Sequence, residues 1–304
     1  MSVAAVFASS PALLIGACLV LGLVVGSFLN VVIHRVPIML ERQWREQCAE
    51  LAEAGHDATV PAAFDVRKDR YNLVVPRSAC PACKAPITAL QNIPVLSYLV
   101  LRGRCAKCQA HISLRYPIVE ALTGILSALV AWKLGFAWPT AAGLVLTWFL
   151  VALAFIDIDH KLLPDSLTLP LLWLGLLLSL FAPAPDVAPV PVDMRSSIIG
   201  AIAGYLCLWS VYHLFRLLTA KEGMGYGDFK LLAAIGAWLG WQMLLPTVLI
   251  AAAVGAVAGI ALLAIRGQSR STPIAFGPFL AAAGWLMLMF GHELVRGYLG
   301  LFAH

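Results

Sequence analysis

The chain has 304 residues, of which 61% are hydrophobic and only 12% carry a charge. Soluble domains contain about 25% charged residues, so this composition excludes an ordinary water-soluble domain and a disordered chain. It indicates a protein that crosses a membrane several times. The net charge of +5 becomes informative only once the charges are placed along the chain.

Long stretches without Asp, Glu, Lys or Arg predict the membrane spans, since a spanning helix needs about 20 apolar residues. The stretch 231–265 is long enough for two helices, and Gly240 to Pro246 is the natural place to divide it. Residues 116–132 form a further span if Glu120 is tolerated near its end. We therefore predict an all-α polytopic fold of about eight transmembrane helices, near 11–34, 116–133, 138–158, 166–184, 196–217, 228–243, 246–265 and 274–295.

The first of these helices could also be a secretory signal. Such a signal opens with positive charge, whereas no Lys or Arg precedes Arg35. We therefore expect a retained span.

Basic residues predict the orientation. With eight spans, 18 of the Lys and Arg residues fall on one side of the membrane and three on the other. The positive-inside rule places the richer side in the cytoplasm, so both termini are expected to face outward. The Pro-rich segment 182–192 then becomes an extracytoplasmic linker.

The polar segment 35–115 forms an insert between the first two spans, with 12 basic and seven acidic residues. We therefore divide the chain into a first transmembrane helix, 1–34, this cytoplasmic insert, and a seven-helix membrane domain, 116–304. The insert holds two CxxC pairs with 21 residues between them, and their cysteines are Cys80, Cys83, Cys105 and Cys108.

Four thiolates in this arrangement suit a structural zinc site of the zinc-ribbon kind. Two disulfides or free thiols are the alternatives, and a cytoplasmic location argues against disulfides. The remaining cysteines, Cys18, Cys48 and Cys207, are interpreted as ordinary side chains.

Acidic residues gather at the predicted cytoplasmic edge of the membrane, where the third span emerges and the sequence contains Asp157, Asp159 and Asp165. Ionisable groups near a bilayer are candidates for function. At helix ends they also serve as solvated caps, which is the reading favoured for Asp165, before the fourth span. Asp159 and His160 are interpreted as interfacial polar groups.

Asp228 differs, because it ends a GYGD sequence whose glycines allow another chain to approach closely. Two carboxylates from different helices can share one proton and act as general acid and general base on a peptide bond. The candidates lie 71 residues apart, and the sequence does not establish that they meet. Neither a Ser-His-Asp arrangement nor an HExxH motif competes with them.

Five motifs in order resemble the bacterial prepilin peptidase family, the type IV prepilin leader peptidases and N-methyltransferases of pilus and type II secretion systems. They are GSFLNVVIHRVP at 26–37, the paired CxxC, RYPIVE at 115–120, IDIDHKLLPD at 156–165 and KEGMGYGDFKL at 221–231. A lone GxGD would be weak evidence, but the resemblance covers nearly the whole chain.

The resemblance implies that Asp157 and Asp228 form the aspartic dyad of an intramembrane protease in the bacterial inner membrane. It implies prepilin and pseudopilin substrates with a short basic leader, cut after a Gly at the cytoplasmic face. The new N-terminal residue is then methylated from S-adenosylmethionine, an activity associated with the insert. Gly103 is a candidate for the methyl-donor site, although a turn before Cys105 explains it better. The lipid bilayer is the other expected partner, and no nucleic acid is expected.

Two other functions are open at this stage. A proton-coupled transporter with a regulatory zinc insert would use membrane carboxylates, although such sites usually lie near the midplane and no inverted repeat is evident. A membrane-anchored zinc adaptor would need no catalysis.

Overall fold

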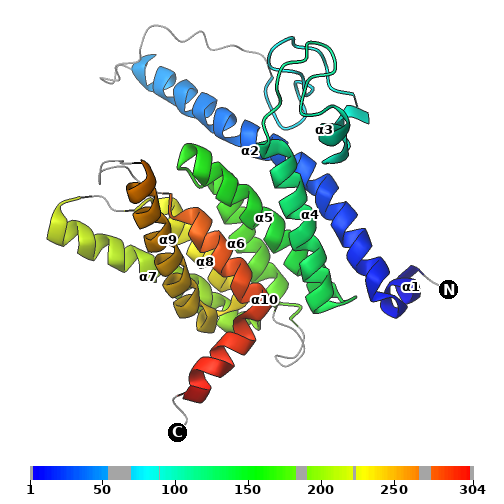
Figure 1. The fold of residues 1–304 in the computed structure, drawn as a ribbon. Helices are drawn as coiled ribbons and strands as arrows, with labels where there is room; N and C mark the ends of the chain where they lie inside the picture. The colour runs from blue at the N-terminus through cyan, green and yellow to red at the C-terminus, as the bar shows by residue number, and fades with distance from the viewer. Residues whose placement is uncertain are drawn as a thin grey trace. The chain divides into compact units, whose positions relative to one another are not determined.

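The computed structural model describes residues 3–53, 70–88, 90–182, 190–221, 224–266 and 275–301. Within these ranges the regular structure is helical, without a β-strand, as the predicted all-α class requires (Figure 1). The chain forms two compact units. One, the membrane unit, comprises Met1–Gly22 and Thr123–His304, and the other, the cysteine unit, comprises Leu23–Leu122.

All eight predicted helices exist. They are α2 (Pro11–Glu53), α4 (Arg115–Leu134), α5 (Trp138–His160), α6 (Asp165–Ser179), α7 (Met194–Thr219), α8 (Tyr226–Leu239), α9 (Leu244–Arg266) and α10 (Gly277–Leu301). Four short elements accompany them: α1 (Val3–Ser9), α3 (Leu96–Val100), and the 3₁₀ turns η1 (Leu90–Asn92) and η2 (Trp241–Met243). In the described part of the chain, six helices are long and apolar enough to cross a membrane, whereas α6 and α8 have only 15 and 14 residues.

The predicted end of the first helix, near residue 34, is wrong, because α2 continues through Pro37 to Glu53. Hydropathy marks where the bilayer ends, and the helix goes on as a polar segment. There Arg45 pairs with Glu41 one turn earlier. Arg35 and Arg42, two turns apart on one face, both lie over the Tyr71 ring, with the guanidinium carbons 5.7 and 4.3 Å from its centroid.

The other predicted boundaries fare better. Gly240 divides the long apolar stretch as expected, with a positive φ of 85° that favours glycine. Pro246 falls in the first turn of α9, where no intrahelical hydrogen bond is lost. Helix α6 ends at Ser179, short of the expected 184. Residues 183–189 of the predicted Pro-rich linker lie outside the described residues.

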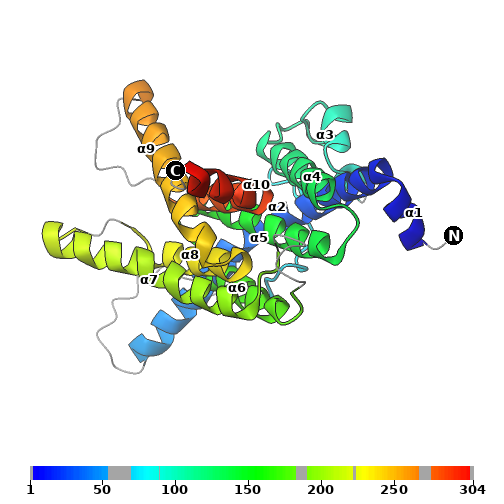
Figure 2. The same cartoon turned by 90° about the horizontal axis from the view of Figure 1, so that it is seen from below.

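The short helix α8 forms the centre of the membrane unit, and every residue from Asp228 to Leu239 except Lys230 is buried. It packs against α6, α7 and α10 (Figures 1 and 2). Ser197 on α7 donates a 2.6 Å hydrogen bond to the Ala237 carbonyl, and the Trp238 indole donates one of 2.8 Å to the Leu171 carbonyl on α6. These two hydrogen bonds connect the C-terminal part of α8 to α7 and to α6.

Glycines let α7 approach the backbone of α8, as small residues do where membrane helices cross closely. A Cβ added at Gly200 would overlap the Gly236 carbonyl group, which is backbone and cannot rotate away. We therefore expect Gly200→Ala to destabilise the membrane unit by about 1–3 kcal/mol. Gly16→Ala is the control, since its Cβ would have no neighbour within 4 Å. Denaturant unfolding in detergent measures both, and equal stabilities would show that the close approach is unimportant.

Candidate active site and metal centre

The first candidate carboxylate, Asp157, lies in the last turn of α5. The helix ends at His160 because Lys161 adopts a left-handed conformation, and the Lys161 N–H donates to the Asp157 carbonyl. The Asp157 side chain is buried, with 6% of the residue exposed. One carboxylate oxygen, Oδ2, accepts a 3.0 Å hydrogen bond from the backbone N–H of Gly277.

The second candidate, Asp228, lies in the first turn of α8, after Gly225 and Gly227. It is equally buried, and its Oδ1 has no hydrogen-bond partner among the described residues. A buried carboxylate oxygen without a partner costs free energy. Such groups are retained where they have a function.

The two carboxylates lie in the same compact unit, close enough for Asp157 to act electrostatically on Asp228. Leu163, in the turn between α5 and α6, lies between the elements that carry them. A Cβ on Gly227 would come within 2.6 Å of the Leu163 Cβ, and one on Gly277 within 3.2 Å of its Cδ1. The structure thus joins helix ends that the sequence alone could not bring together.

Gly277 and Leu163 are the site residues that sequence reasoning missed. Gly277 acts through its backbone N–H and its lack of a side chain, so no chemistry-bearing side chain signals it. The available signal was Gly277 followed by Pro278, a pair that marks a turn or a helix start.

The neighbouring acidic residues do not join the pair. Asp159 and His160 are exposed, as expected of interfacial groups. The predicted capping role of Asp165 is wrong, because Pro164 is the N-cap and no side chain caps this helix. Asp165 instead binds the Lys230 ammonium through both carboxylate oxygens, at 2.6 and 2.7 Å. Its partner is therefore a side chain of α8 and not the backbone N–H groups of α6.

The cysteine unit brings the four predicted sulfurs together, with all four ligand atoms within 4.8 Å of one another. Cys80 and Cys108 have sulfurs 3.8 Å apart, and those of Cys83 and Cys105 are 3.9 Å apart. A tetrahedron with Zn–S bonds of about 2.3 Å has sulfurs about 3.8 Å apart. The residues present therefore fit a four-thiolate metal ion.

Each CxxC pair lies in the same kind of turn. In the first, Cys80 N–H donates to the Ala85 carbonyl and Lys84 N–H to the Cys80 carbonyl, both at 2.9 Å. The second repeats these bonds 25 residues later, from Cys105 to Ala110 and from Gln109 to Cys105, at 2.9 and 3.0 Å.

Backbone hydrogen bonds lower the pKa of the first cysteine in each turn and so favour its thiolate form. Backbone hydrogen bonds from Cys108 and then Lys107 lower the pKa of Cys105 to about 6. The equivalent bonds from Cys83 and Ala82 lower the pKa of Cys80. Since thiolates are the form that binds metal, these hydrogen bonds favour metal binding at the first cysteine of each turn.

Gly103 occupies a turn before Cys105, which was the alternative to a methyl-donor role. Its φ is +67°, its N–H donates to the Tyr98 carbonyl at 2.9 Å, and its carbonyl accepts from Ile112 at 2.8 Å. A Cβ there would come within 2.6 Å of the Tyr98 hydroxyl. The backbone accounts for this glycine without a ligand, and a methyl-donor role for it stays a prediction.

Fold and site together define a class of protein: a polytopic helical membrane protein with two buried carboxylates at helix ends and a separate four-cysteine unit. A family model described as the bacterial peptidase A24 N-terminal domain matches residues 20–134. A second, described as the type IV leader peptidase family, matches residues 144–260.

Similar proteins extend over nearly the full length. A protein of Aeromonas salmonicida named prepilin leader peptidase/N-methyltransferase is 56% identical over 277 residues, 91% of each chain. Proteins of the same name from Stutzerimonas stutzeri and Pseudomonas aeruginosa are 50% and 49% identical, over 96% of each chain. The chain therefore belongs to the prepilin leader peptidase family, as its motifs indicated. No solved structure matches it.

Proposed function

We propose that this protein is a bifunctional prepilin-processing enzyme, which removes the leader peptide of prepilins and N-methylates the new N-terminus. One observation supports the proposal: Asp157 and Asp228 are both buried and within electrostatic range of each other, in a chain 56% identical to a protein named for these two activities. Transport of protons is less well supported, since both carboxylates lie at helix ends.

Cleavage follows from the chemistry of a carboxylate pair. One aspartate is ionised and takes a proton from water, while the other is protonated and polarises the scissile carbonyl. Water attacks directly, and no covalent acyl-enzyme forms. The pair titrates as a unit, so neither role is assigned to one residue.

The substrates are prepilins and type II secretion pseudopilins with short basic leaders, cut after a Gly. We place the site at the cytoplasmic face of the bacterial inner membrane, with both termini outside. The distribution of basic residues, 18 against three, supports this orientation.

Methylation uses S-adenosylmethionine as the methyl donor and belongs to the insert, 35–115. This proposal includes the domain boundaries after residues 34 and 115, which set the insert apart from the first helix and from the seven-helix membrane domain. The four cysteines hold Zn²⁺ as a structural ion, because four thiolates leave no open position for water or substrate. The ion supplies folding free energy to the insert and takes no part in cleavage.

Mass spectrometry of a prepilin co-expressed with the protein tests both activities at once. We expect two changes in the prepilin, loss of the leader and a mass increase of one methyl group, reported separately. A prepilin in which the Gly before the cleavage site is replaced is the matched control and should stay uncut. An unprocessed prepilin beside correctly inserted protein would exclude the proposed function, and would leave a transporter or an adaptor.

A further inference from the structure

The first residue of α10, Gly277, contacts the candidate active site in two ways. Its backbone N–H donates to Asp157 Oδ2 at 3.0 Å. A Cβ built on it would lie 2.6 Å from the same oxygen and 3.2 Å from the carboxylate carbon. The carboxylate therefore occupies the volume that any side chain at this position would need.

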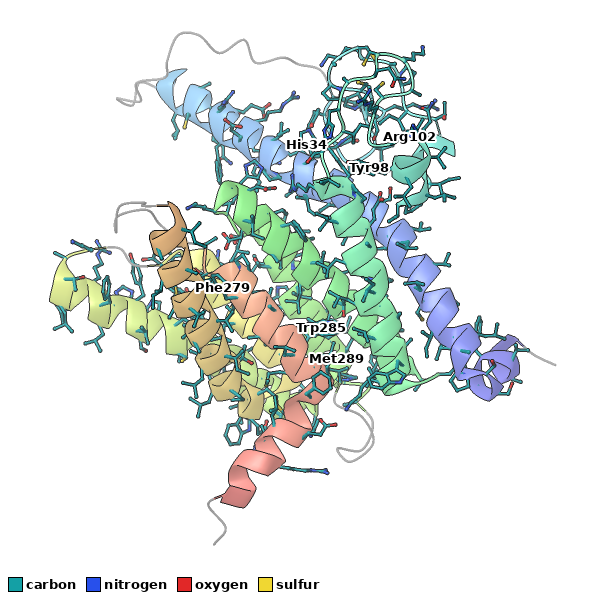
Figure 3. All side chains as sticks on the ribbon, in the orientation of Figure 1. His34, Tyr98, Arg102, Phe279, Trp285 and Met289 are labelled. Atoms are coloured by element: carbon teal, nitrogen blue, oxygen red, sulfur yellow. The ribbon has the colours of Figure 1, made fainter. Side chains whose placement is uncertain are left out.

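Helix α10 is held in place beyond this contact. The Trp285 indole donates a 3.2 Å hydrogen bond to the Thr147 hydroxyl on α5, the helix that carries Asp157. Figure 3 labels Phe279 and Trp285 on α10. Phe279 packs against Gly255 of α9, whose added Cβ would lie 3.2 Å from the ring. The N–H of Gly277 thus belongs to a helix that is packed against both α5 and α9. Its position is set by α10 and not by the rotamer of Asp157.

The fixed position of this N–H makes the two carboxylate oxygens of Asp157 inequivalent. Because only Oδ2 accepts the Gly277 N–H, the two oxygens of Asp157 have different hydrogen-bonding environments before substrate binds. A fixed donor also keeps the carboxylate in one rotamer before substrate arrives, which is the positional control that catalysis requires.

We propose that Gly277 is a positioning residue for leader cleavage, an inference that rests on the proposed protease function. Its N–H holds Asp157 Oδ2, and its missing side chain leaves the space that the carboxylate fills. The matched family region ends at residue 260, so this contribution comes from a helix beyond it.

Gly277→Ala tests the proposal. The added methyl group displaces the carboxylate, and a misplacement of about 1 Å costs on the order of 10²-fold in rate. We expect kcat for leader cleavage to fall by about this factor with KM little changed, and Gly277→Val to lose more. Methylation of a synthetic peptide that begins at the mature N-terminus should stay at the wild-type rate.

Gly284→Ala is the matched control. It lies on the same helix, and its Cβ would press on the Ile235 Cδ1 atom at 2.8 Å, a similar steric load away from Asp157. Its unfolding stability should match that of Gly277→Ala while its kcat stays within a few-fold of wild type.

Equal kcat values for the two variants would overturn the positioning role. The positioning role would also be overturned if Gly277→Ala lost methylation as well as cleavage and was less stable to unfolding than Gly284→Ala. That combination would mean that the variant misfolds. A wild-type protein that leaves prepilin uncut, or full cleavage by Asp157→Asn, would instead refute the proposed protease function, and the positioning role with it.

Discussion

Asp157→Asn and Asp228→Asn should each lower the rate of leader cleavage by on the order of 10³-fold or more. Asparagine keeps the shape of the side chain but neither ionises nor carries an acidic proton. If the pair acts as acid and base, either change removes one proton-transfer step completely. Quantification of cut and uncut prepilin after timed incubation with purified variants measures the loss.

Asp159→Asn is the matched control, two residues after Asp157 but exposed. It removes one negative charge from the same helix end and should leave cleavage near the wild-type rate. Full activity in either dyad variant would refute the aspartic mechanism. An equal loss in all three would show that the charge of the region matters and the dyad does not.

Stability distinguishes chemistry from structure at Asp228. Its Oδ1 is buried without a partner in the described part of the chain, so replacement by Asn breaks no hydrogen bond at this oxygen. Asp228→Asn should therefore unfold no more easily than wild type while it loses cleavage. Active sites commonly show this exchange of stability for function.

The sequence was a good guide to the helices, because membrane insertion depends on apolar length. It predicted the existence of α8 and α9 and the turn between them, which begins at Gly240 with a positive φ and ends where Pro246 lies in the first turn of α9. It misplaced the end of α2, since a polar helix beyond the membrane carries no hydropathy signal. Arg42 of that extension lies over the Tyr71 ring, a contact that depends on tertiary structure.

The site divides in the same way. The candidate aspartates were recognisable because carboxylates are conspicuous in an apolar chain, but their proximity depends on α6 and α10, which each pack against both α5 and α8. Asp165 was misread because its carboxylate pairs with Lys230, 65 residues away, a contact that only the tertiary structure shows. Gly277 was missed because a backbone N–H belongs to every residue except proline, and only the fold shows where it points.

Replacing Cys80 or Cys105 by Ser should reduce bound zinc from one ion per chain to less than about a tenth, because four thiolates are needed to close the tetrahedron. Each is the first cysteine of its turn and receives the backbone hydrogen bonds that favour its thiolate. Metal analysis of purified protein measures the loss. Cys48→Ser and Cys207→Ser, which replace exposed cysteines outside the cluster, should keep the full zinc content.

Loss of zinc should unfold the cysteine turns and leave the membrane unit folded. Structural zinc contributes about 10–16 kcal/mol of apparent binding free energy in zinc-finger peptides, far more than two short turns can replace. Leu23–Leu122 and the membrane unit are separate compact units. Limited proteolysis of the chelated protein should therefore cut within 70–115 and spare α5 to α10.

The activities should divide along the same boundary. If methylation belongs to the insert, Cys80→Ser abolishes it, while the Asp157 and Asp228 pair, which has no contribution from the cysteines, still cuts prepilin at a measurable rate. Zinc-free wild-type protein with normal resistance to protease would refute the structural ion. Loss of cleavage as complete as in Asp157→Asn would show that the insert is part of the protease, whereas cleavage without methylation assigns the two reactions to different units of one chain.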